Sequence, residues 1–201
     1  MKITFMEDTG ADFAASLRIV LATIVLCGGL YPLCIFTFAR IATPGSASGS
    51  LLRDRSGMVV GSRLIAQSFT RPGYFWPRPS AVKYNAEGAG GSNLSPASPE
   101  VRQRAVQTVA DYGADTNRPL PADLAAASGS GLDPFITLRA ALFQAPRVAA
   151  ARGMTLAGVE TVIRRQTAGQ QIFSSGEGLV NVLVLNMELD AVKKNSSASR
   201  Q

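Results

Sequence analysis

An uncharged apolar run near the N-terminus constrains this chain more than any other feature. Residues 19–39 read IVLATIVLCGGLYPLCIFTFA and are bracketed by Arg18 and Arg40. A helix of this length spans about 31 Å, close to the roughly 30 Å hydrocarbon core of a bilayer. A buried helix of a soluble protein normally carries a polar stripe, which this run lacks. The run therefore predicts a membrane-spanning helix from Ile19 to Ala39.

A cleaved signal peptide is the alternative interpretation of the same run. Its apolar part would cover only about 7–15 residues and lead into a small-x-small cleavage site. Here the run is longer, and Ser46-Ala47-Ser48 makes a poor cleavage site. We therefore expect an uncleaved anchor. Pro32 removes one hydrogen bond inside this helix and predicts a kink, next to Gly28 and Gly29, which permit close helix packing.

Charge leaves the orientation of this helix undecided. Lys2 and Arg18 precede it, and Arg40, Arg53 and Arg55 follow it. The margin of one basic residue is too small for the positive-inside rule, and large domains cross membranes largely regardless of charge.

The remainder of the chain predicts an α+β domain, because three helices and a few strands follow without regular alternation. The expected organisation is a short N-terminal segment (1–18), the membrane helix (19–39), a linker (40–57), one extramembrane α+β domain (58–190) and a disordered tail (191–201).

Capping residues place the first two of the three helices expected in this domain, and apolar spacing places the third. Ser98-Pro99-Glu100 begins the first helix and Gly113 ends it. The second covers 138–152, between Thr137 and Gly153, and Pro146 inside it predicts a kink or two short helices. The third covers 155–167.

Two apolar stretches predict strands, and a long irregular segment lies between them. Residues 58–67 favour one or two strands, and 179–187 (LVNVLVLNM) favour a buried strand interrupted by Asn181. Residues 68–97 are rich in Pro, Gly and aromatic residues and show no period. We expect the part from 69 to 84 either to contact partners, as aromatic and Arg side chains often do, or to fill a small core.

Composition excludes several classes of site within this chain. The chain has no His, so Ser–His–Asp and Cys–His mechanisms are excluded, as is any zinc site that needs imidazole. Both Cys lie inside the apolar run. No phosphate loop or dinucleotide fingerprint is present. The net charge of +6 is scattered rather than clustered, which argues against nucleic-acid binding.

Two short patterns leave chemical alternatives open. The Gly-rich stretches 88–93 and 128–134 predict either an anion site made of backbone N–H groups or ordinary turns. Ser80 and Lys83 match the S-x-x-K pattern, so a membrane-anchored periplasmic Ser–Lys hydrolase is the alternative function.

Seven stretches, in order along the chain, together resemble the C subunit of the Kdp-type potassium-transporting ATPase of bacteria. They include Gly61-Ser62-x-Leu64-Ile65-x-Gln67, Pro72-x-Tyr74-Phe75-x-x-Arg78-Pro79-Ser80-Ala81, Gly90-Gly91-Ser92-Asn93-Leu94, Pro121-Ala122-Asp123-Leu124, the stretch 127–134 (ASGSGLDP), Gln144-x-Pro146-Arg147-Val148 and Val180-Asn181-Val182-Leu183-x-Leu185-Asn186. Phe135 departs from the family pattern, where a polar residue is expected, and Ser95 stands where Gly is usual.

The resemblance implies a set of residues that serve assembly or coupling rather than catalysis. These are Tyr74, Phe75, Arg78, Ser92, Asn93, Ser128, Gly129, Ser130, Gly131, Leu132, Asp133, Pro146, Arg147, Asn181 and Asn186. Neither a catalytic residue nor a metal ligand is implied. If the loop needs a positive φ at Gly129, a Gly129→Val change should disrupt assembly.

The resemblance also implies a function and a location. The chain is similar to a single-span, non-catalytic accessory subunit of an ATP-driven potassium uptake pump in the bacterial inner membrane. Its partners would be a channel-like potassium-binding subunit, a P-type ATPase subunit and a small fourth subunit. It would act as a catalytic chaperone that raises the ATP affinity of the ATPase subunit, with its N-terminus cytoplasmic and its main domain periplasmic. ATP would enter only through the complex, because a core of about 30 Å separates that domain from the ATP site; direct ATP binding stays an alternative.

Overall fold

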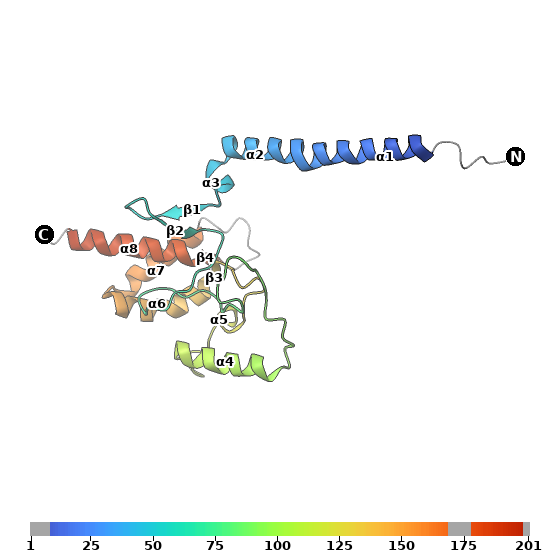
Figure 1. Cartoon of the computed structure of the whole chain (residues 1–201). Coiled ribbons are helices and arrows are strands. Elements are labelled where there is room, and N and C mark those ends of the chain that lie inside the picture. The colour runs from blue at the N-terminus through green and yellow to red at the C-terminus, as the bar shows by residue number, and fades with distance from the viewer. Residues whose placement is uncertain (1–8, 169–177, 199–201) are drawn as a thin grey trace. The chain divides into compact units, whose positions relative to one another are not determined.

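The computed structural model describes residues 9–168 and 178–198, which fall into two compact units (Figure 1). The first unit is Met1–Ser50 and the second is Leu51–Gln201.

The first unit is dominated by one long apolar helix. It consists of α1 (Thr9–Thr23), the π-helical stretch η1 (Ile24–Leu30) and α2 (Tyr31–Ala42), which follow one another without a break. Gly10–Ala42 is long and apolar enough to cross a membrane, with a mean hydropathy of 2.3 and no buried part. The expected span from Ile19 to Ala39 lies within it, and the helix extends further at both ends.

Pro32 is accommodated by a wider helical turn. The Tyr31 N–H donates to the carbonyl of Leu26, five residues back, and both Leu30 and Tyr31 keep right-handed helical angles. Proline has no N–H, so pairing cannot continue regularly through it, and π-helical turns are a known way to absorb such an interruption. The helix therefore continues through Pro32.

The linker is shorter than expected. After α2 the chain forms a single helical turn, α3 (Pro44–Ala47). Strand β1 (Leu51–Arg53) lies inside the range 40–57 that was expected to be linker, and it pairs antiparallel with β2 (Val59–Ser62). The Asp54 carboxylate organises the turn between them by accepting from the Ser56 and Met58 N–H groups at 2.8 and 3.0 Å.

The core of the second unit forms where helices pack on a small sheet. Strand β3 (Phe135–Thr137) pairs antiparallel with β4 (Leu179–Asn181), and α6 (Leu138–Arg152) packs on α7 (Leu156–Ala168). The short helix α5 (Ala122–Ala125) and α4 (Pro99–Tyr112) complete the unit with α8 (Val182–Ala198). This mixed arrangement is the α+β fold that the sequence predicts.

The capping signals placed α4 and α6 correctly, and apolar spacing placed α7 within one residue at each end. The Ser98 and Thr137 hydroxyls accept from the N–H groups of Val101 and Ala140, and Gly113 and Gly153 end α4 and α6 in the left-handed region. The expectation of two short helices around Pro146 is wrong, because α6 is one continuous helix. Pro removes a single backbone bond, and core packing along the buried face of α6 holds the helix together.

The expectation of one buried strand over 179–187 is wrong after Asn181. Only Leu179–Asn181 is a strand, and α8 begins at Val182. The Asn181 side-chain oxygen accepts from the Val184 N–H at 3.1 Å, so Asn181 caps a helix instead of interrupting a strand. α8 also continues to Ala198, so residues 191–198 of the expected disordered tail are helical; 199–201 lie outside the described residues.

Candidate functional site

Two buried amide side chains hold the aromatic segment against the helices. Asn186 on α8 accepts from the Phe75 N–H at 2.8 Å and donates to the Phe75 carbonyl at 3.0 Å. Gln144 on α6 does the same for the next residue, accepting from the Trp76 N–H at 2.9 Å and donating to its carbonyl at 3.0 Å. We call these four pairings the amide lock. They satisfy the backbone of a segment that has no helix or strand of its own.

Two arginines extend the amide lock toward residues 72–74. Arg147 donates to the carbonyls of Pro72 and Tyr74 at 2.6 and 3.0 Å, and its guanidinium lies 3.9 Å from the centre of the Trp76 ring. Arg152 donates to the Gly73 carbonyl and pairs with Asp190 on α8 at 2.8 Å. Burial lowers the pKa of Arg147.

Aromatic rings surround the same place. Trp76 meets Tyr112 edge-on at 5.3 Å, and Tyr112 meets Phe143 at 6.2 Å. Burial raises the pKa of Tyr112 well above its ordinary value, although the nearby Arg147 opposes the shift. The Phe75 side chain is fully buried in the core. For Phe75, the structure therefore supports the core-filling interpretation of the aromatic segment.

The predicted residues Tyr74, Phe75, Arg147 and Asn186 meet here, and Asn181 supports the adjoining end of α8. The Asn181 side chain donates to the Arg63 carbonyl at 2.8 Å while it caps α8. Pro146 is on the exposed side of α6. Gln144, Arg152 and Asp190 also contribute to this cluster but were not among the site residues predicted from the sequence. The spacing of Gln144 and Arg147, three residues apart on one helix face, was the available signal.

The second cluster is built on the loop Ser128–Pro134, which we call the glycine loop. Asp133 forms a salt bridge with Arg78 at 3.0 Å and accepts from the Phe135 N–H, also at 3.0 Å. The Arg78 guanidinium also reaches the Ala127 carbonyl at 3.4 Å. Arg78 and Asp133 thus tie the aromatic segment to this loop.

Other segments pair with the glycine loop through the backbone. The Ser128 N–H donates to the Pro79 carbonyl at 2.9 Å, and the Gly90 N–H donates to the Ser130 carbonyl at 2.8 Å. The predicted residues that follow Gly90 differ in exposure, since Ser92 is half-buried whereas Asn93 is exposed with a φ of 51°.

The glycine loop needs its positive φ at Gly131 and not at Gly129. Gly131 has a φ of 69°, and a Cβ there would lie 2.5 Å from Val82 and 2.8 Å from the Gly90 carbonyl oxygen. Gly129 has no positive φ, and nothing lies within 4 Å of the place of its Cβ. The condition on which the Gly129→Val expectation depended is therefore not met.

The outer side of the glycine loop borders an open depression of about 510 Å³. Exposed Gly129 and Ser130 line it beside half-buried Leu132 and Phe135. The full lining is Leu64, Ile65, Ser128, Gly129, Ser130, Leu132, Asp133, Pro134 and Phe135. Apolar side chains next to loop hydroxyls form a surface suited to protein contact. Phe135, the departure from the family pattern, is part of this surface.

Ser80 and Lys83 are used in a turn. The Ser80 hydroxyl oxygen accepts from the Tyr84 N–H at 2.9 Å, and Lys83 is exposed with a φ of 54°. A Ser–Lys mechanism needs the amine close to the hydroxyl in a sheltered pocket. This local geometry therefore gives the hydrolase alternative no support.

The described ranges give no support to a metal site or to an anion site in the glycine loop. Within residues 9–168 and 178–198, no group of three His, Cys, Asp or Glu side chains is placed to hold a metal ion. Ser130 hydroxyl accepts from the Leu132 N–H at 3.1 Å, and the Asp133 N–H donates to Ser128 at 3.4 Å. These N–H groups of the glycine loop thus serve the loop itself.

Comparison with known proteins identifies relatives along almost the whole chain. The family model described as "K+-transporting ATPase, c chain" (KdpC) matches residues 13–191. A potassium-transporting ATPase KdpC subunit from Parvibaculum lavamentivorans is 52% identical over 182 residues, covering 90% of this chain and 97% of the relative. A KdpC subunit from Geobacter sulfurreducens is 45% identical, over 89% of this chain and 96% of the relative. A KdpC subunit from Myxococcus xanthus is 44% identical, over 90% of this chain and 88% of the relative.

Proposed function

The chain belongs to the KdpC family of K⁺-transporting ATPase c chains, and we propose that it is the accessory subunit that assembles the pump and raises ATP affinity. The supporting observation is that the family match runs from residue 13 to 191, which covers most of the apolar helix and most of the second unit. The resembling motifs fall in that second unit, where they form the amide lock and the glycine loop.

The proposed partners are the channel-like potassium-binding subunit, the P-type ATPase subunit and the small fourth subunit. We assign the depression beside the glycine loop as the contact surface for one of these subunits. Gly129 and Ser130 are exposed there, whereas the neighbouring amide lock is turned inward. An interface needs accessible side chains on a rigid support, and the backbone pairings of this loop provide that support.

The chaperone role requires coupling over a distance. With the N-terminus cytoplasmic and the second unit periplasmic, as we propose, a bilayer core of about 30 Å separates the second unit from the ATP site. An effect on ATP affinity must then pass through partner subunits that can adopt two conformations, one of which binds ATP more tightly. This chain would favour the tighter-binding conformation of its partners without contacting ATP itself.

Co-expression with the pump subunits tests the proposal. A tag on this chain tests whether the subunits co-purify. A tag on the ATPase subunit then yields pump prepared with and without the chain, and K⁺-stimulated ATP hydrolysis by both preparations is measured over a range of ATP concentrations. We expect the subunits to co-purify and the KM for ATP to be lower when the chain is present. A pump that assembles and hydrolyses ATP equally well without it would refute the proposal.

A matched pair of variants tests whether the depression is the contact surface. Ser130→Arg places a bulky charge in the depression beside the glycine loop, and Gln107→Arg places the same charge on the exposed face of α4. We expect Ser130→Arg to lower the yield of complex and Gln107→Arg to leave it unchanged. Equal yields would remove the depression as the contact surface.

A further inference from the structure

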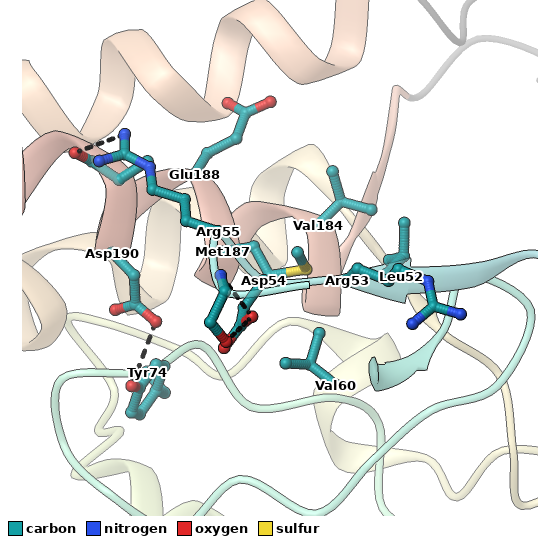
Figure 2. A pocket seen from close by; sticks show the side chains of 12 residues that line it. Leu52, Arg53, Asp54, Arg55, Val60, Tyr74, Val184, Met187, Glu188 and Asp190 are labelled. Atoms are coloured by element: carbon teal, nitrogen blue, oxygen red, sulfur yellow. Dashed lines mark hydrogen bonds between the residues drawn. The ribbon is translucent and has the colours of Figure 1, made fainter. Parts of the chain in front are cut away.

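The β1–β2 hairpin has two faces of different character. On one face, Leu52 and Val60 are half-buried and line a groove of about 680 Å³ together with Val184 and Met187 of α8 (Figure 2). The Arg55 guanidinium donates to the Ala191 carbonyl at 3.5 Å. This face is therefore directed toward the body of the second unit.

The other face of the hairpin exposes apolar side chains. Arg53 is paired with Val59 in the strand register, beyond a bulge, and Leu51 lies two residues before Arg53 on the same strand, so the three side chains are expected on one side of the hairpin. Arg53 is also one of the residues that line the groove (Figure 2). Leu51 is 48% exposed and Val59 43%, and Met58 at the end of the turn is 65% exposed. We call Leu51, Arg53, Met58 and Val59 the outer hairpin face.

This face carries positive charge. Arg53 is exposed and donates one N–H to the Gly57 carbonyl at 2.8 Å, so its guanidinium is fixed beside the turn between β1 and β2. The Asp54 carboxylate is occupied by the N–H groups of the turn. Apolar side chains beside a fixed guanidinium are typical of groups that rest in the headgroup region of a bilayer.

The covalent chain restricts what this face can meet. The apolar helix ends at Ala42 and β1 begins at Leu51. Nine residue steps reach at most about 30 Å even when fully extended, and α3 shortens that reach. A linker of this length allows the hairpin to reach the surface of a membrane that the helix crosses.

The composition of the face favours lipid over a protein partner. Protein interfaces are enriched in Trp, Tyr and Arg anchors, and of these the outer hairpin face has Arg53 alone. Leu, Val, Met and Arg are sufficient for shallow insertion, because apolar burial and attraction to phosphate act together there.

We propose that the outer hairpin face rests on the bilayer surface, with Leu51, Met58 and Val59 among the headgroups and Arg53 on the phosphate of an anionic lipid. The contact would give the second unit a second attachment to the membrane. Its effect on the pump would be to limit rotation of the second unit about the linker.

Lipid-borne quenchers test the proposal on the full-length chain. In a Cys27→Ser/Cys34→Ser background, Met58→Cys is labelled with an environment-sensitive fluorophore and reconstituted into nanodiscs of equal parts phosphatidylethanolamine and phosphatidylglycerol. Val106→Cys on α4 is the matched control, because Val106 is also an exposed apolar residue, at 64%. We expect headgroup-linked nitroxide lipids to quench the label at 58 severalfold more than the label at 106. Equal quenching at the two sites overturns the proposal.

Removing the positive charge of Arg53 provides a second test of the proposal. Arg53→Gln keeps a donor for the Gly57 carbonyl but removes the positive charge, and Arg102→Gln on α4 is its control. We expect Arg53→Gln to reduce quenching at 58 in nanodiscs with phosphatidylglycerol, and Arg102→Gln to leave it unchanged. Quenching that does not respond to Arg53→Gln overturns the assignment of Arg53 to lipid phosphate.

The same label in the assembled pump distinguishes lipid from protein. Protection of the label at 58 from aqueous iodide, together with strong lipid quenching, supports the proposal. Protection from iodide without lipid quenching means that a partner subunit covers the outer hairpin face, and it overturns the proposal.

Discussion

The amide lock and the glycine loop use residues of the same family pattern for opposite purposes. In the amide lock, the side chains of Gln144 and Asn186 are 1% and 2% exposed, and every bond is directed inward. In the glycine loop, Gly129 and Ser130 are exposed and the Arg78–Asp133 pair is only half-buried. The family pattern therefore contains some residues that are buried in the domain and others that remain exposed on its surface.

The largest effect is expected from breaking the amide lock. Asn186→Ala leaves the N–H and carbonyl of Phe75 without their partner in a buried place, which costs about 2–5 kcal/mol of unfolding free energy. Chemical denaturation of the reconstituted chain measures this loss. Gln107→Ala is the control, because Gln107 is exposed and bonds only Asp111 on its own helix; a loss as large as that of Asn186→Ala would contradict the assignment.

Gly131 and Gly129 should differ within the glycine loop. Gly131→Val forces a β-branched side chain into a left-handed conformation and against the Gly90 carbonyl, at a cost of about 2 kcal/mol or more. Gly129→Val meets nothing and should leave the melting temperature nearly unchanged. Thermal unfolding of the two variants compares them, and equal destabilisation would show that the loop is folded differently.

Stability should fall at alkaline pH because two buried tyrosines, one beside each cluster, keep their protons in the folded chain. Burial raises the pKa of Tyr112 beside the amide lock and of Tyr84, whose hydroxyl donates to the Arg78 carbonyl at 3.0 Å. The unfolded chain loses these protons above about pH 10 while the folded chain keeps them, so stability falls as pH rises beyond that value. Denaturation at several pH values should show that Tyr112→Phe removes more of this fall than Tyr84→Phe. The reverse order would count against the deeper burial of Tyr112.

The salt bridge between the clusters should matter less for stability than for assembly. Arg78 and Asp133 are partly exposed, so Asp133→Asn should cost about 1 kcal/mol. Because Asp133 borders the depression, the yield of complex should fall more than stability does. Co-purification and thermal unfolding measured on the same preparations test this; a large loss of stability with normal assembly would reverse the interpretation.

The smallest effect is expected at Ser80 and Lys83. Lys83→Ala removes an exposed side chain, and Ser80→Ala removes one acceptor for the Tyr84 N–H. K⁺-stimulated ATP hydrolysis by the pump should be retained in both variants. Loss of activity in a well-assembled complex would revive the hydrolase alternative.

Local signals in the sequence predicted the long elements well and the short ones poorly. Ser98, Thr137, Gly113 and Gly153 placed helix ends correctly, because caps act through neighbouring backbone groups. The run 179–187 was misjudged, since a short apolar stretch fits a buried strand and a buried helix equally well. Asn181 decided between them only through its hydrogen bonds to Val184 and to the distant Arg63.

The candidate site shows the same limit. Nothing local in the sequence shows that Gln144 and Asn186 bind neighbouring residues of one loop. The Gly129→Val prediction was conditional on a positive φ in this loop, and the approach of Gly90 and Val82 places that requirement at Gly131. Contacts between residues far apart in the chain are invisible to spacing arguments.

The sequence by itself determined the apolar helix, the absence of imidazole chemistry and the family resemblance, because each depends on composition or on residues in order. The tertiary structure alone decided which motif residues face inward and which face solvent. Burial depends on what packs against a side chain, and for the aromatic segment the partners are α6 and α8, more than sixty residues further along the chain.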